Sequence, residues 1–153
     1  MSAPTDLPDG PDPDAIVRSI TEHFDRVDVV TASGGWFFSC DAEKHWPNFA
    51  TLVTSDEYDQ TSDLDREGVF RLNMGVGRAT FDRIGAAADP DITVFDRLFP
   101  HPVYGAQRWV SIVNPSAATF RDVVHPLLEE AYEIVAGRAA RLAKAGEAAR
   151  RPG

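Results

Sequence analysis

Hydrophobic and polar residues follow patterns along this chain that change period several times. After a proline-rich stretch, apolar residues recur at helical spacing from Ile16 to Phe24. Asp12-Pro13 is typical of an N-cap followed by proline at the first helical position, so a helix is predicted over about 13–26. A β-branched run over 27–31, a glycine turn and an aromatic run over 36–41 then predict a hairpin.

Three further stretches have strand character. They cover residues 49–54, 69–74 and 108–113. Strict alternation in the second stretch separates two faces, one with Phe70, Leu72 and Met74, the other with Val69, Arg71 and Asn73. This alternation predicts a strand with a core on one side and polar chemistry on the other.

Helical spacing returns between and after these strands. A short helix is predicted from Val76 to Ile84, with Gly85 as its stop, and one helical turn over 94–99 that ends at Pro100. The last segment carries one apolar stripe from Phe120 to Leu142. Pro126 falls inside that stripe, so a kink or a restart of the helix is expected there.

The order of these elements predicts an α+β fold, an antiparallel β-sheet with the N- and C-terminal helices packed on one face. Residues 1–13 are predicted to be a flexible, acidic, proline-rich lead-in and residues 14–144 a single α+β domain. Residues 145–153 are predicted to be a disordered basic tail.

Charge and cysteine content narrow the class of protein. The net charge of −9 at pH 7 disfavours a nucleic-acid surface, because neutralising phosphates requires clustered Lys and Arg. The start of the chain lacks the features of a signal peptide and no apolar run approaches about 20 residues, so a cytoplasmic location away from the membrane is expected. Cys40, the single cysteine, lies in an apolar run and is predicted to be buried and inert.

The candidate ligand-binding residues lie on the polar side of the 69–74 strand and in the 101–109 loop. An arginine on a strand can pair with a carboxylate or phosphate, and histidine titrates near neutral pH. The alternative is a loop whose polar groups satisfy one another and the backbone. The set consists of Arg71, Asn73, His101, Tyr104, Gln107 and Trp109.

No catalytic residue, metal site or cofactor is predicted. The chain has no Gly-x-Ser-x-Gly, P-loop or dinucleotide fingerprint, and its four histidines, His23, His45, His101 and His125, show no ligand spacing. The acidic loop over 55–68 could offer oxygen ligands from Asp56, Asp59, Asp63 and Asp65, yet it matches no EF-hand pattern. Whether this loop binds a cation stays open.

Two long blocks, residues 62–76 (Ser62-Asp63-Leu64 to Val76) and 101–115 (His101-Pro102-Val103 to Pro115), carry a resemblance. The chain resembles an uncharacterised bacterial domain-of-unknown-function family over nearly all of 14–137. It is distantly similar to YjbR/MmcQ-type (double-wing) proteins, through the 69–84 unit, the Trp109 strand and the closing Leu127-Leu128-Glu129-Glu130-Ala131-Tyr132 helix. The resemblance implies a compact α+β fold with a sheet backed by terminal helices, and DNA binding by analogy, which the net charge disfavours.

The function predicted from these observations is a small non-catalytic binding or interaction module of the cytoplasm, with an unknown small ligand or protein partner. A homodimer is possible through an open sheet face. One alternative is an enzyme on a small anionic substrate, with His101 as the base and Arg71 as the anion clamp. A second alternative is a DNA-binding protein, as some YjbR-type proteins are described.

Overall fold

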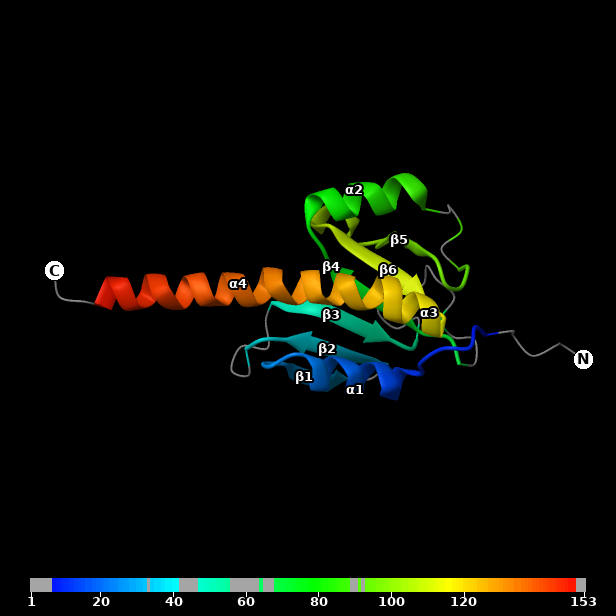
Figure 1. Cartoon of the computed structure of the whole chain (residues 1–153), viewed down its shortest axis with the longest axis horizontal. Helices are drawn as coiled ribbons and strands as arrows, with labels where there is room; N and C mark the ends of the chain where they lie inside the picture. The colour runs from blue at the N-terminus through cyan, green and yellow to red at the C-terminus, as the bar shows by residue number, and fades with distance from the viewer. Residues whose placement is uncertain are drawn as a thin grey trace, which may run out of the picture.

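The described part of the chain forms one antiparallel sheet of six strands, in the order β1-β2-β3-β4-β6-β5 (Figure 1). The structure is a computed structural model that describes residues 7–32, 34–41, 47–55, 64, 68–88, 91 and 93–150. The strands are β1 Asp28–Ala32, β2 Gly35–Ser39, β3 Asn48–Val53, β4 Arg71–Gly75, β5 Leu98–Pro100 and β6 Trp109–Val113. The predicted hairpin is β1–β2, with Val30 opposite Phe37.

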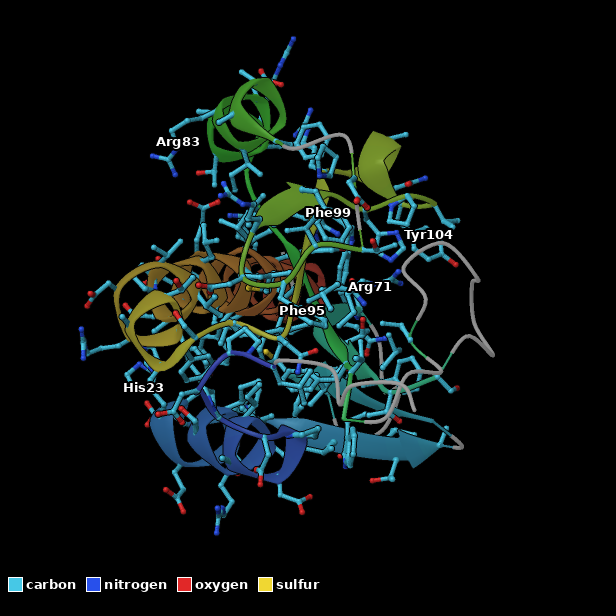
Figure 2. All side chains as sticks on the ribbon, turned by 90° about the vertical axis from the view of Figure 1, so that its right-hand side faces the viewer. His23, Arg71, Arg83, Phe95, Phe99 and Tyr104 are labelled. Carbon is cyan, nitrogen blue, oxygen red and sulfur yellow. The ribbon has the colours of Figure 1, made fainter. Side chains whose placement is uncertain are left out.

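The helices lie on one face of this sheet, as the sequence predicts (Figures 1 and 2). They are α1 Pro13–His23, α2 Arg78–Ala87, α3 Ala117–Thr119, a π-helical segment η2 Phe120–Val124 and α4 His125–Arg150. A short 3₁₀ segment, η1 Gly105–Gln107, precedes β6. The α+β fold with terminal helices on one side is therefore confirmed, and α4 continues past the predicted domain boundary at residue 144.

Alternation along the strands decides which side chains meet the helices. Leu72 and Met74 of β4 are fully buried in the main core, while Arg71 and Asn73 point to the opposite face. In β3, Asn48 and Ala50 oppose neighbouring residues of β2, so Phe49 is an extra residue at a bulge. The bulge turns Phe49 toward the helices, where full burial of such a ring contributes roughly 1.5–3 kcal/mol.

A seam of aromatic contacts joins α1 to α4. Phe24, just after α1, stacks on Tyr132 with ring centroids 4.4 Å apart and an interplanar angle of 18°. The ring of Phe49 meets Tyr132 edge-on at 5.4 Å, and the Tyr132 hydroxyl accepts a hydrogen bond of 3.2 Å from the Arg26 backbone N–H. The predicted cap of α1 is present, because the Asp12 carboxylate accepts from Ala15 N at 2.8 Å.

The other face of the sheet carries a second, smaller apolar cluster. It consists of Val53, Leu64, Val69, Phe99 and Val113, with Phe95 and Ala88 packed against it. The cluster covers the end of the face where β3, β4, β6 and β5 meet, next to Arg71 and Asn73. Polar and apolar groups therefore share a buried layer on the side without the long helices.

Two local predictions are wrong. Residues 94–99 form no helical turn: Phe95 bridges to Val113, and Leu98–Pro100 pairs with β6 as an edge strand. Edge pairing tolerates Pro100, since an edge strand needs no donor on its outer side. Gly85 does not stop α2, which continues to Ala87 because glycine costs only about 1 kcal/mol inside a helix.

The predicted irregularity at Pro126 takes the form of a π turn. In η2 the His125 backbone N–H donates to the Phe120 carbonyl, and Pro126 follows directly. A proline lacks the N–H that an α-helix would use at this point, and the wider turn precedes it without ending the helix.

The described residues of the predicted lead-in contact the body of the protein. The Ala117 backbone N–H donates to the Asp9 carbonyl at 2.9 Å, and Gly10 lies against Pro115. No helix among the described residues is long and apolar enough to cross a membrane.

Candidate functional site

The central strands bring together most of the residues predicted as a ligand site. Asn73 of β4 is paired with Thr51 of β3 on one side and with Ser111 of β6 on the other. Its Oδ1 accepts from Arg71 Nε at 2.9 Å and from Ser111 Oγ at 2.7 Å, while its Nδ2 donates to Thr51 Oγ1 at 3.0 Å. We call these four residues, together with His101, the Arg71 network.

His101 joins the Arg71 network from the end of β5. Its backbone N–H donates to the Trp109 carbonyl at 2.9 Å, and its Nδ1 accepts from the N–H groups of Val103 and Tyr104, at 3.0 Å each. A nitrogen that accepts carries no proton, so the neutral ring has its proton on Nε2. This Nε2 lies 3.5 Å from Arg71 Nη2. Both nitrogens carry protons, so the two side chains offer hydrogen-bond donors to the same small region of the structure.

The Arg71 network is buried except at Thr51, which is half-buried. Arg71 and Asn73 expose 1% and 2% of their surface, and His101 exposes 6%. Among the described residues, no buried side-chain nitrogen or oxygen lacks a hydrogen-bond partner. The network therefore organises the interior of the sheet's second face, and the ligand-binding role of its members stays a prediction.

The other predicted site residues lie around this network without joining it. Tyr104 is 55% exposed and its ring lies 5.0 Å from the His101 ring, so it marks the surface end of the network (Figure 2). Gln107 is exposed on η1. Trp109 is half-buried and packs on Gly75, where an added Cβ would come within 3.1 Å of the indole.

A cleft lies on the opposite face, where the helices are. It has a volume of about 780 Å³ and is bounded by α2, the start of β5 and the junction of α3, η2 and α4; we call it the α2–α4 cleft. Its apolar lining includes Ile84 and Leu127, both buried, and the remaining lining residues are Arg83, Ala87, Asp96, Arg97, Leu98, Thr119, Asp122, Val123 and Pro126. The volume is in the range of sites for small ligands.

In the α2–α4 cleft, the acidic side chains have hydrogen-bond donors within the protein, whereas the arginines form no ion pair with a described residue. Asp122 is held by Arg121 through hydrogen bonds of 2.9 and 3.0 Å, which keep the pKa of its carboxyl below the ordinary value. The Asp96 carboxylate accepts from Ser116 N at 2.8 Å. Arg83 and Arg97 are exposed and form no ion pair with any residue that the structure describes. The cleft thus offers two guanidinium groups beside an apolar lining.

A second group of polar side chains comes together at the α1–α4 seam. His23, at the end of α1, lies near His125 and Glu129 in the first turns of α4, and each of the three can offer one ligand atom to a metal ion. Along the sequence the histidines show no ligand spacing, but folding brings together His23 and His125, which are 102 positions apart. The i, i+4 spacing of His125 and Glu129 on one helix was the available signal.

Cys40 lies in a different environment from these polar groups. It is buried in the main core as a free thiol. Burial raises the pKa of the Cys40 thiol above its ordinary value, although the charge of Arg26 partly opposes this. The prediction of a buried cysteine is confirmed. The four aspartates of the predicted acidic loop, Asp56, Asp59, Asp63 and Asp65, lie outside the described residues.

Comparisons with known proteins place the chain in a family without an assigned activity. A model of a family of unknown function, DUF6194, matches residues 11–144. No curated protein matches the chain, and no solved structure matches it. The match spans every strand together with the Arg71 network and the α2–α4 cleft. The similarity to YjbR-type proteins stays a prediction.

Proposed function

The chain belongs to DUF6194, a family of unknown function, and we propose that it is a non-catalytic module that binds a small organic anion with an apolar body. The ligand lies in the α2–α4 cleft, with its anionic group toward Arg83 and Arg97. The observation that carries this proposal is the presence of two arginines without an ion pair among the described residues, beside an apolar lining. Guanidinium groups bind carboxylates and phosphates through charge-assisted hydrogen bonds.

The surroundings of the α2–α4 cleft support an anionic ligand. Of the two carboxylates on the lining, Asp122 is paired with Arg121, whose positive charge lowers its repulsion of an anion, and Asp96 accepts from the Ser116 backbone N–H. The apolar lining, with Leu98 and Leu127, matches a hydrocarbon body. Most small-molecule sites combine such an apolar wall with a few polar groups that set the orientation.

The enzyme alternative has less support. A general base must have a free lone pair at the nitrogen that faces the substrate. Nδ1 of His101 already accepts two backbone N–H groups, and Nε2 carries the proton in the neutral ring. In this tautomer Nε2 of His101, 3.5 Å from Arg71 Nη2, can only donate a hydrogen bond and offers no lone pair to a substrate.

The test is titration of the full chain with a panel of carboxylates and phosphate monoesters that differ in the length of their apolar part, followed by calorimetry. Arg83→Gln and Arg97→Gln each remove a charge-assisted hydrogen bond worth about 1.5–3 kcal/mol, so binding is expected to weaken roughly 10- to 150-fold. The matched control is Arg78→Gln, because Arg78 is also on α2 but pairs with Asp82 at 4.0 Å and does not line the cleft.

A second variant tests the position of the ligand independently of the arginines. Val123 lines the cleft and is exposed, so Val123→Glu adds a negative charge there without disturbing the core, and binding of the anion should be lost. Equal affinity in Arg83→Gln, Arg97→Gln and Arg78→Gln would contradict the proposal. Absence of binding across the whole panel would also contradict it and would favour a protein partner.

A further inference from the structure

The cluster at the α1–α4 seam has the donor set of a transition-metal site. Its three members are His23, His125 and Glu129, and we call them the His23 cluster. Their candidate ligand atoms all lie within 4.8 Å of one another. Two imidazole nitrogens and one carboxylate oxygen are a common donor set for Zn²⁺ in proteins.

The distances inside the His23 cluster come close to those of a metal site. Glu129 Oε1 lies 3.5 Å from His23 Nε2 and 3.3 Å from His125 Nδ1. Zinc bonds of about 2.0–2.1 Å at tetrahedral angles place two donor atoms about 3.3 Å apart. Two of the three donor pairs therefore already have this separation, and the third needs only a movement of side chains.

One side chain of the His23 cluster is packed against the protein, and the other two are exposed enough to move. His125 is the least exposed member, at 24% of its side chain, and its ring meets the Phe120 ring edge-on. His23 and Glu129 are exposed to 43% and 50%, so they can adjust around an ion and leave room for water in a fourth position. The two histidine rings already lie 4.3 Å apart, edge to face.

The backbone fixes the approach of the two helices before any metal binds. The stack of Phe24 on Tyr132 and the hydrogen bond from Arg26 N to the Tyr132 hydroxyl hold the end of α1 against α4. His125 and Glu129 lie one turn apart on α4, and therefore on one face of it. The chain is also acidic, with a net charge of −9, which raises the local concentration of cations.

A purely structural ion pair explains the convergence less well. Exposed ion pairs contribute little to stability, and one carboxylate needs only one partner. Here two imidazoles from different helices approach the same carboxylate oxygen, Oε1 of Glu129. From this geometry we propose that His23, His125 and Glu129 bind one divalent transition-metal ion, with Zn²⁺ as the best match, and that the ion links α1 to α4.

The proposal is independent of the α2–α4 cleft, because no member of the His23 cluster lines that cleft. It adds a ligand of a different class from the organic anion. Loss of anion binding would leave the metal site intact, and loss of the metal site would leave the anion-binding proposal intact.

The test uses the full chain without an affinity tag, freed of metal with EDTA and titrated with Zn²⁺ in a calorimeter. One equivalent should bind. His23→Gln and Glu129→Gln each remove a ligand and should weaken binding by at least the roughly 10- to 100-fold that outer-shell changes cause. Both residues are half-exposed, so the variants are expected to fold. Glu133→Gln, an exposed carboxylate one turn further along α4, is the matched control and should bind as the parent does.

A second readout locates the ion. Hydrogen exchange of the last turn of α1 should slow when Zn²⁺ is added to the parent chain and should not change in His23→Gln. Absence of Zn²⁺ binding, or binding that His23→Gln and Glu129→Gln leave unaltered, would overturn the proposal. Zn²⁺ binding without any slowing of exchange in α1 would refute the link between the two helices.

Discussion

Replacing Asn73 by alanine tests whether the Arg71 network holds the central strands together. Asn73 is 2% exposed and makes three hydrogen bonds, one to each of Arg71, Ser111 and Thr51. Asn73→Ala removes all of them while leaving the backbone of β4 unchanged. The variant therefore isolates the contribution of one side chain to the sheet's buried polar layer.

The expected loss in the free energy of unfolding follows from the buried groups that Asn73→Ala leaves without a hydrogen-bond partner. The Nε–H of Arg71 and the hydroxyl of Ser111 lose their acceptor in a buried place, and an unsatisfied buried group costs about 1–3 kcal/mol, with charged groups at the upper end. Thr51 is only half-buried, so water can replace its lost donor at little cost. The sum is roughly 3–5 kcal/mol, a large part of the 5–15 kcal/mol that stabilises a typical domain.

Urea unfolding followed by tryptophan fluorescence measures the change, provided that the m-value is the same in both proteins. Asn73→Asp is the control, because its carboxylate keeps both acceptor positions and the Thr51 hydroxyl can turn to donate to it. It should lose clearly less stability than Asn73→Ala. A loss below about 1 kcal/mol in Asn73→Ala would refute the argument, since water would then satisfy the abandoned groups.

Two further predictions concern single positions elsewhere. Gly85→Ala should stabilise the protein by about 1 kcal/mol and raise the midpoint of thermal unfolding by roughly 2–4 °C. The reason is that Gly85 lies inside α2 and an added Cβ would meet only Pro100 Cγ, at an ordinary contact distance of 3.7 Å. A lower midpoint would show that the helix does not extend as described. Burial raises the pKa of Cys40 above its ordinary value, so the unfolded chain loses this proton first as pH rises. Cys40 should therefore contribute a loss of stability as pH rises through the ordinary thiol range of about 8.5, and Cys40→Ser should lack that component when the two pH profiles are compared.

The sequence predicts the sheet well wherever one face is buried under helices. The alternation of Phe70, Leu72 and Met74 predicts both β4 and its orientation, because a strand with one side in the core must keep period two. The segment at 94–99 was predicted wrongly for the converse reason: it lies at the sheet's edge, where Phe95 and Phe99 reach the smaller second cluster and no periodicity is imposed. Gly85 was wrongly predicted to end α2, because the free-energy cost of a glycine inside a helix is smaller than the stabilisation that α2 gains by packing Ile84 into the core.

The candidate sites likewise have some features that a local sequence pattern predicts and others that depend on the tertiary fold. Arg71 and Asn73 share a face by period two alone, so their association was predictable, but their near-complete burial was not, because it depends on side chains from β3, β5 and β6. The His23 cluster depends on how α1 crosses α4, which no local pattern encodes. Three lining residues of the α2–α4 cleft, Asp96, Arg97 and Leu98, lie in the segment that was predicted as a helical turn, so the sequence did not place them at this cleft.

The seam between α1 and α4 has a consequence for how the chain folds during its synthesis. The hydrogen bond from Arg26 to Tyr132 joins residues 106 positions apart, so Phe24 has Phe49 as an early ring partner but lacks the stacking partner Tyr132 until most of the protein has been made. At 5–20 residues per second the ribosome needs roughly 5 to 20 s to produce that intervening chain. Ile16 and Ile20 of α1 belong to the same core as Leu127 and Leu128 of α4, so this core is incomplete until that helix has been made. The main core is therefore completed only after translation of the last helix, and the apolar surface that this helix covers stays uncovered until then.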